Sequence, residues 1–96
     1  MITRVVKLTI DSHHVEEFIK TFESKQKDIA KFAGCQKVEL LYDVACPNIL
    51  YTISHWDTED HLQDYRDSGF FEDTWTTVKK LFAGKPEAWS LKQVEA

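Results

Sequence analysis

Hydrophobic residues recur at every second position in several parts of this chain, and that spacing is typical of β-strands. The segments concerned are rich in β-branched and aromatic residues, and they cover residues 2–10, 35–45, 49–56 and 88–94. The sequence Cys-Pro-Asn at 46–48 separates the second segment from the third and predicts a turn, because proline cannot donate a hydrogen bond to a sheet. We therefore predict four strands.

A helical spacing of three and four positions separates the first two predicted strands. Apolar residues follow this spacing from Val15 to Phe32, and charged residues occupy the opposite face. Asp11 or Ser12 is the candidate N-cap, since either side chain can accept a hydrogen bond from the free amides of a first turn. Gly34 follows the last apolar residue, at a position where a left-handed residue often ends a helix. The pattern predicts one long amphipathic helix.

Two shorter helices are predicted between the third and fourth strands. The first covers residues 59–66 and is stopped by the Asp-Ser-Gly sequence that follows it. The second begins at Phe70 or Phe71, carries an aromatic stripe, and is terminated by Gly84 and Pro86. The complete order is β-α-β-β-α-α-β, which is the α+β ferredoxin-like, split β-α-β arrangement with an antiparallel four-stranded sheet.

In this arrangement the helices cover one face of the sheet, so the polarity of the other face becomes informative. The residues that we assign to that second face are apolar, namely Val5, Leu41, Leu50, Trp56 and Val94. A domain of 96 residues buries too little surface to leave all of them in water. A second copy of the chain is the simplest cover, because symmetric pairs are the commonest oligomers. We therefore expect a homodimer.

Composition and charge narrow the possible partners. Residues 1–96 form a single domain with 43% hydrophobic and 29% charged residues and a net charge of −4. Because no basic surplus exists to neutralise phosphates, we expect neither nucleic-acid binding nor membrane binding. No apolar run approaches the roughly 20 residues that span a bilayer, and the N-terminal segment lacks signal-peptide features, so we expect a cytoplasmic protein. Cys35 and Cys46 fall at opposite ends of one predicted strand and are expected to be free thiols.

The second half of the chain carries residues that resemble a known family. Trp56 ends a strand, the acidic sequence Asp-Thr-Glu-Asp follows it, and Leu62 lies in the short helix. Ser-Gly-Phe-Phe at 68–71 leads into an aromatic-bearing helix, and the last strand carries a tryptophan. In these residues, and in length and element order over nearly the whole chain, the sequence is similar to the antibiotic biosynthesis monooxygenase (ABM) domain family. The resemblance implies the dimeric α/β barrel fold, in which two ferredoxin-like sheets face each other.

The resemblance implies several activities. Members of the family oxidise polycyclic phenols with oxygen and without metal or flavin, oxidise quinols, degrade haem, or handle small signalling molecules. The haem-degrading type fits poorly, because its Asn, Trp and His positions correspond to about Val6, Tyr65 and Trp75 here. Many other members carry a histidine at the position of Tyr65, and that group is also replaced.

We therefore expect an oxidoreductase of monooxygenase type that acts on a small aromatic or quinol-like metabolite without cofactor or metal. The alternative is a non-catalytic module on the same scaffold, with a role in binding a small ligand or in regulation. An isomerase or lyase on this scaffold would also need only one base.

Cofactor-free oxygenation needs an apolar pocket for an aromatic substrate and one base that titrates near neutrality. His61 and His55 are the candidate bases, and Tyr65 lies four positions after His61 as its candidate hydrogen-bond partner. Arg4 stands among apolar strand residues, from which its guanidinium could fix an anion or a phenolate. The candidate walls are the large aromatic residues Trp56, Trp75 and Phe71.

Each candidate also has a purely structural interpretation. His55 could face solvent or a dimer interface, and His61 could be an exposed residue near a helix start. Tyr65 and the aromatic walls could simply fill the core, and Arg4 could pair with Glu87 or another acid. No nucleophile motif, phosphate-binding glycine loop or metal-ligand cluster is present in the sequence.

Overall fold

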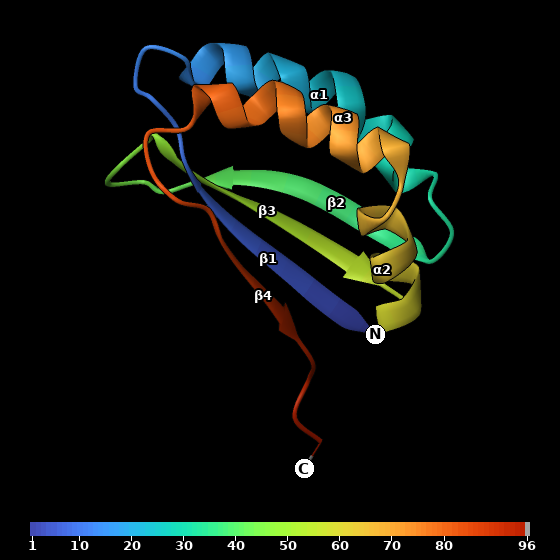
Figure 1. Cartoon of the computed structure of the whole chain (residues 1–96). Helices are drawn as coiled ribbons and strands as arrows, with labels where there is room; N and C mark the ends of the chain where they lie inside the picture. The colour runs from blue at the N-terminus through green and yellow to red at the C-terminus, as the bar shows by residue number, and fades with distance from the viewer. Residues whose placement is uncertain (96) are drawn as a thin grey trace.

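A computed structural model describes residues 1–95 and confirms the α+β architecture and the element order (Figure 1). Its elements are β1 (Ile2–Thr9), α1 (Val15–Ala30), β2 (Cys35–Tyr42), β3 (Ile49–Trp56), α2 (Glu59–Arg66), α3 (Gly69–Val78), the 3₁₀ turn η1 (Lys79–Leu81) and β4 (Glu87–Leu91). The four strands form one sheet in the order β2-β3-β1-β4. Every neighbouring pair is antiparallel, as the ferredoxin-like arrangement requires.

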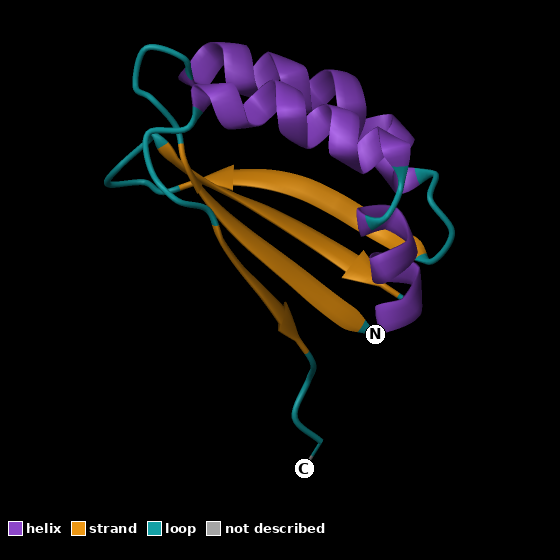
Figure 2. Ribbon diagram, in the orientation of Figure 1, coloured by secondary structure: helices purple, strands orange, loops and turns teal. Residues whose placement is uncertain are grey.

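The helices lie on one side of the sheet and leave the other side without a covering element (Figure 2). Side chains alternate between these two faces along each strand. Ile2 and Leu8 of β1 point toward the helices and are buried. Their direct partners across the β1–β3 ladder are Trp56 and Leu50, which are 0% and 1% exposed. The hydrophobic core therefore lies between the sheet and the helices.

The assignment of Leu50 and Trp56 to the second face is wrong. Residues that pair directly across a ladder point to the same face, and the register joins Leu50 to Leu8 and Trp56 to Ile2. Both side chains consequently belong to the helix-covered core. Val94 lies beyond β4 and is 89% exposed, because the last strand ends at Leu91.

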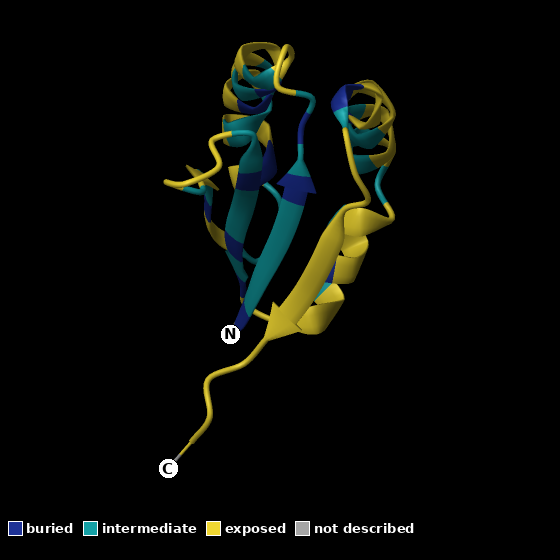
Figure 3. Ribbon diagram, turned by 90° about the vertical axis from the view of Figure 1, so that its left-hand side faces the viewer, coloured by how far each residue is buried: buried dark blue, intermediate teal, exposed yellow. Residues whose placement is uncertain are grey.

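The uncovered side, which we call the open face, carries a row of apolar residues flanked by the ion pairs Lys7–Glu87 and Lys37–Glu39. Val5 pairs with Ile53 on one side and with Trp89 on the other, so these three residues form a row across the sheet. Leu41 and Leu91 extend the same face toward its two edges. Trp89 and Leu91 are 43% and 48% exposed, and β4 is exposed along its whole length (Figure 3). Of the five residues predicted for this face, Val5 and Leu41 lie on it, together with Ile53, Trp89 and Leu91.

The start of α1 differs from the prediction. Its N-cap is His14, which makes no side-chain capping bond. Asp11 instead accepts a hydrogen bond from the backbone amide of His13, at 2.9 Å, and closes a turn ahead of the helix. At the other end α1 stops at Ala30 with Lys31 as its C-cap, so Gly34 does not end the helix; it has the predicted positive φ, of 83°, in the turn before β2. None of the helices in the described part of the chain is long and apolar enough to cross a membrane.

The loop between β2 and β3 is longer than the predicted three-residue turn. Strand β2 ends at Tyr42, and the Asp43 carboxylate accepts hydrogen bonds from the amides of Ala45 and Cys46, at 2.8 and 2.9 Å. An aspartate that binds amides further along the chain in this way favours a turn over continued pairing. Cys46 therefore lies in the loop, and both it and Cys35 are free thiols.

Candidate functional site

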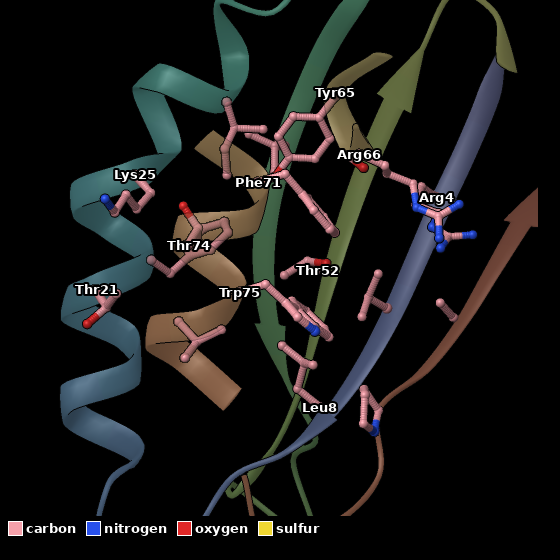
Figure 4. Close-up of a pocket in the computed structure, with 18 of the residues that line it drawn as sticks. Arg4, Leu8, Thr21, Lys25, Thr52, Tyr65, Arg66, Phe71, Thr74 and Trp75 are labelled. Atoms are coloured by element: carbon pink, nitrogen blue, oxygen red, sulfur yellow. The ribbon is translucent and has the colours of Figure 1, made fainter. Parts of the chain in front are cut away.

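A cavity of about 300 Å³ lies between the sheet and the helices (Figure 4). Strand residues of the helix-covered face form its floor, and α1, α2 and α3 contribute the remaining walls. Most of the lining side chains are apolar, among them Val6, Leu8, Phe22, Leu62 and Val78. This volume is at the small end of the range for small-molecule sites, and it accommodates roughly one or two aromatic rings.

A series of aromatic rings leads from the core to the cavity. Trp56 stacks on Tyr65 with ring centroids 5.1 Å apart, and Tyr65 meets Phe71 edge to face at 5.2 Å. Phe71 stacks in turn on Trp75 at 5.8 Å. Tyr65, Phe71 and Trp75 line the cavity. Contacts of this kind fix the ring orientations, so the wall presents defined aromatic faces to a ligand.

Trp56 is a core residue and not part of the cavity lining. Its indole nitrogen donates a hydrogen bond to the Ser54 hydroxyl at 2.9 Å, which satisfies its only polar atom. Ser54 and Tyr65 both line the cavity, and the indole lies behind them. The sequence predicts Trp56 as part of the pocket wall. In the structure it lies outside the cavity and supports Tyr65, which does line it.

One serine fixes the corner between α2 and α3. The Ser68 hydroxyl donates to the carbonyl oxygen of Tyr65 at 2.6 Å and accepts from the amide of Phe71 at 3.1 Å. It thus binds the end of one helix to the start of the next. Because Tyr65 and Phe71 are also neighbours in the cavity wall, the orientation of the wall depends on this cap.

Two arginines lie together at one end of the cavity (Figure 4). Arg4 comes from β1 and donates a hydrogen bond from Nη1 to the Ser90 hydroxyl of β4, at 2.9 Å. Arg66 is the last residue of α2. We call these two residues the arginine pair. The sequence singles out Arg4 but gives no sign that Arg66 would lie beside it.

The arginine pair has no ion-pair partner within residues 1–95. The carboxylate suggested for Arg4, that of Glu87, lies 3.6 Å from the Lys7 ammonium instead. Burial, and then the nearby charge of Arg66, lower the pKa of Arg4 below its ordinary value. Both effects disfavour a cation at this position, and a nearby anion would offset them.

The structure does not bring the two candidate histidines into the cavity. His55 lies on the open face, where its Nδ1 is 3.3 Å from the hydroxyl of its ladder partner Thr3. His61 lies at the start of α2, with its Nδ1 2.8 Å from the Thr58 hydroxyl. Its ring packs against Gly34 so closely that a Cβ there would collide with it. His61 is therefore bonded to the helix cap, and not to Tyr65.

Tyr65 is the predicted catalytic residue that does reach the cavity. Burial, with a smaller contribution from nearby Cys35, raises the pKa of Tyr65 to about 12. The phenol therefore stays protonated at neutral pH. It can donate a hydrogen bond to an oxygen anion, but it cannot serve as a base.

Thr74 is a second residue that the sequence does not reveal. Its hydroxyl oxygen is buried and has no hydrogen-bond partner among the described residues. The neighbouring hydroxyls of Thr76 and Thr77 donate to carbonyl oxygens one turn earlier, at 2.9 and 3.0 Å. Thr74 also lines the cavity, so a ligand atom can supply the missing bond.

The charged and ionisable groups of the cavity lining are cations and one phenol, contributed by Arg4, Lys25, Tyr65 and Arg66. The Lys25 ammonium lies 5.4 Å from the centre of the Phe70 ring and is engaged in a cation–π contact. No cluster of three or more His, Cys, Asp or Glu residues that could hold a metal ion occurs among residues 1–95. The arrangement suits an apolar ligand that carries negative charge at one end.

Comparison with known proteins identifies the relatives of this chain. The family model described as antibiotic biosynthesis monooxygenase matches residues 1–76. Among solved structures, a conserved protein from Methanosarcina mazei is similar with a TM-score of 0.90 and 21% identity over 98% of this chain and 94% of that chain.

Two bacterial proteins assigned to the same family are also similar. The one from Bordetella bronchiseptica has a TM-score of 0.88 and 20% identity, over 98% of this chain and 97% of that chain. The one from Caulobacter crescentus has a TM-score of 0.86 and 23% identity, over 98% and 90% respectively. Likeness at such identities shows the fold alone. No curated protein matches the chain.

Proposed function

The chain belongs to the antibiotic biosynthesis monooxygenase family, and from that membership we propose that it is a cofactor-independent monooxygenase acting on a small aromatic or quinol-like metabolite. The observation that carries the proposal is the apolar cavity between sheet and helices, with aromatic rings along its wall and the arginine pair at one end. An electron-rich ring fits beside Phe71 and Trp75, in a mostly apolar part of the lining.

In this proposal the substrate ionises without a basic side chain. A phenol bound near the arginine pair has a lowered pKa, because adjacent positive charge favours its anion. The anion passes an electron to oxygen, and one oxygen atom then bonds to a ring carbon that loses its hydrogen. The other oxygen atom leaves as water. The ring supplies the electrons, so no external reductant is consumed.

The protonated Tyr65 would stabilise the reduced oxygen species. Because the pKa of Tyr65 is raised to about 12, its hydroxyl is a hydrogen-bond donor throughout the neutral range. His61 in this scheme positions the start of α2, and His55 belongs to the open face. Neither is assigned the role of a base.

Oxygen consumption tests the proposal. Wild-type protein with a panel of small phenols and hydroquinones should consume oxygen faster than the same solutions without protein. With ¹⁸O-labelled oxygen, the quinone product should gain one labelled atom. Arg4→Gln should lower the rate at least about tenfold, since removing an electrostatic donor at a reacting centre costs that much or more. His61→Ala should retain most of the rate if it remains folded, and uptake no faster than the protein-free control would contradict the proposal.

A second candidate function is a non-catalytic module that binds a small ligand. The observation that favours it is the composition of the lining, in which the ionisable groups are three cations and one phenol with a raised pKa. General acid–base catalysis ordinarily uses a group that titrates near the working pH. Ligand binding by the wild type without oxygen uptake or product would favour this function.

We also propose that the protein is a homodimer in which the open faces of two sheets meet. The row formed by Val5, Ile53 and Trp89 supports this, because a contiguous apolar surface on a small domain is typical of an interface. A two-fold pairing places the same row on both partners. The cavity lies on the other side of the sheet, so dimerisation leaves it accessible.

A further inference from the structure

We propose that Arg4 and Arg66 bind the oxyanion group, carboxylate or phosphate, of an otherwise apolar aromatic ligand. The inference rests on the proposed function in so far as it takes the cavity as the ligand site. It adds a chemical class to that ligand and assigns Arg66 as a specificity-determining residue.

The first argument is the convergence of two guanidinium groups from distant parts of the sequence. Arg4 lies on β1 and Arg66 at the end of α2, yet both line the same end of the cavity (Figure 4). A strand and a helix that each contribute one guanidinium form a two-sided site. Planar guanidiniums bind carboxylate and phosphate through parallel N–H···O bonds, so two of them can hold both oxygens of one such group.

The second argument is the missing counter-charge. Three ion pairs are found in residues 1–95, and all three use lysines, namely Lys7 with Glu87, Lys20 with Glu16, and Lys37 with Glu39. The side-chain hydrogen bond of Arg4 goes to a neutral partner, the Ser90 hydroxyl. The lowered pKa of Arg4 has burial and the Arg66 charge as its causes, and an anion placed between the two arginines would offset both.

The third argument is the contrast with the rest of the cavity. Beyond the arginine pair most of the lining side chains are apolar or aromatic, including Phe71 and Trp75, and the hydroxyls of Thr21, Thr52 and Ser54 are the main exceptions besides Thr74. Lys25, the remaining cation of the lining, is engaged with the Phe70 ring. The buried Thr74 hydroxyl offers a second polar contact from α3. A ligand with one charged end, a body of one or two rings and one further polar atom would satisfy all of these groups.

The test compares three probes that share one ring system. These are 2-naphthoate, 2-naphthyl phosphate and the neutral 2-naphthamide, and their binding is measured by calorimetry. We expect wild-type protein to bind at least one anionic probe ten times or more tightly than the amide. Arg66→Gln should weaken binding of that anion about tenfold and change binding of the amide less than twofold. The anion that loses more affinity identifies the carboxylate or the phosphate as the natural group.

Matched variants separate this effect from a general loss of charge or of structure. Lys79→Gln removes one positive charge from the end of α3, outside the cavity lining, and should leave all three affinities unchanged. Ser90→Ala removes the hydrogen bond of Arg4 while keeping its charge, so its anion affinity should fall less than that of Arg4→Gln. Circular dichroism confirms that each variant is folded.

The possible failures are distinguishable. Equal affinity for the anions and the amide would overturn the role of the arginine pair and leave the aromatic site in place. Anion-selective binding that depends on Arg66, without any oxygen uptake, would support the arginine pair and contradict the monooxygenase. Failure of all three probes to bind at millimolar concentration would overturn the role of the arginine pair, and oxygen uptake tests the monooxygenase separately.

Discussion

The two faces of the sheet use the same four strands for different purposes. On the helix-covered face, alternate residues pack into the hydrophobic core. They do not fill all the space below the helices, and the cavity lies in the remainder. On the open face, the intervening residues form the apolar row beside two ion pairs and have no covering element. Because neighbours along a strand point in opposite directions, each change of one residue affects one face only. The contrast indicates that ligand binding and subunit association can be altered separately.

Matched leucines on the two faces give the largest expected difference. Leu50 is 1% exposed on the covered face, and Leu91 is 48% exposed on the open face. Leu50→Ala should reduce the free energy of unfolding by about 2–5 kcal/mol, because it leaves a void in the core. Leu91→Ala should cost less than about 1 kcal/mol in dilute protein.

Urea denaturation at two protein concentrations measures both leucine variants. If the open face is a dimer interface, the cost of Leu91→Ala should grow with protein concentration, whereas that of Leu50→Ala should not. Equal costs for the two leucines would remove the distinction between the faces.

A charge on the open face should break the proposed dimer. Ile53→Glu places a carboxylate opposite Val5 at one end of the apolar row, across the ladder from Glu39, where a second copy could not solvate it. We expect the dissociation constant of the dimer to rise about 100-fold, which is roughly 2.7 kcal/mol. Light scattering coupled to size exclusion measures this. If the wild-type protein is monomeric at micromolar concentration, the homodimer proposal is contradicted and the variant is not needed.

Tyr65, on the helix-covered side, should make the stability of the protein depend on pH in the alkaline range. Its pKa is raised from 10.0 to about 12 by burial and by Cys35. As the pH rises, the unfolded chain loses the phenol proton at a lower pH than the folded chain does. The contribution of Tyr65 to the free energy of unfolding is therefore complete below pH 10 and is lost as the pH rises toward 12. It amounts to about 2–3 kcal/mol.

Thermal unfolding between pH 9 and pH 12 tests this contribution. The wild type should lose stability more steeply than Tyr65→Phe, while Tyr42→Phe, at an exposed tyrosine, should follow the wild type. Parallel curves for the wild type and Tyr65→Phe would argue against a buried phenol.

The smallest effect is expected at Thr74. Thr74→Val keeps the shape of the side chain and removes a buried hydroxyl that has no partner among the described residues. Stability should stay the same or rise by up to about 1 kcal/mol, because an unsatisfied polar group disappears. Affinity for the cavity ligand should fall severalfold. Thr77→Val, which removes a hydroxyl bonded to the Asp73 carbonyl, is the matched control and should leave that affinity unchanged.

The order of elements could be predicted from the sequence because hydrophobic residues recur clearly in every segment. They recur every two positions in the strands and every three to four positions in the helices. Residues 59–66 form α2 with the predicted bounds. The facing of Leu50 and Trp56 could not be predicted, since β3 has apolar residues at both odd and even positions and only the register with β1 decides between them.

The candidate site was harder to predict for a related reason. Arg4 stands out because a charged residue among apolar strand positions is unusual. Arg66 does not stand out, because an arginine at a helix end is ordinary, although it lies four positions after Leu62 on the same helical face. His55 was selected for its chemistry, yet its position in the strand alternation directs it away from the helices.

The edge strand β4 contributes residues both to the cavity side of the sheet and to the apolar row on the open face. Ser90 holds Arg4 at the cavity, and Trp89, its immediate neighbour, contributes to the apolar row on the far side. A ligand that moved Arg4 and β4 together would also move the indole on the opposite surface. Occupancy and self-association would then be thermodynamically linked, each strengthening or weakening the other by the same factor. Titrations of one ligand at several protein concentrations would measure that factor directly, and a constant affinity would show that β4 transmits nothing.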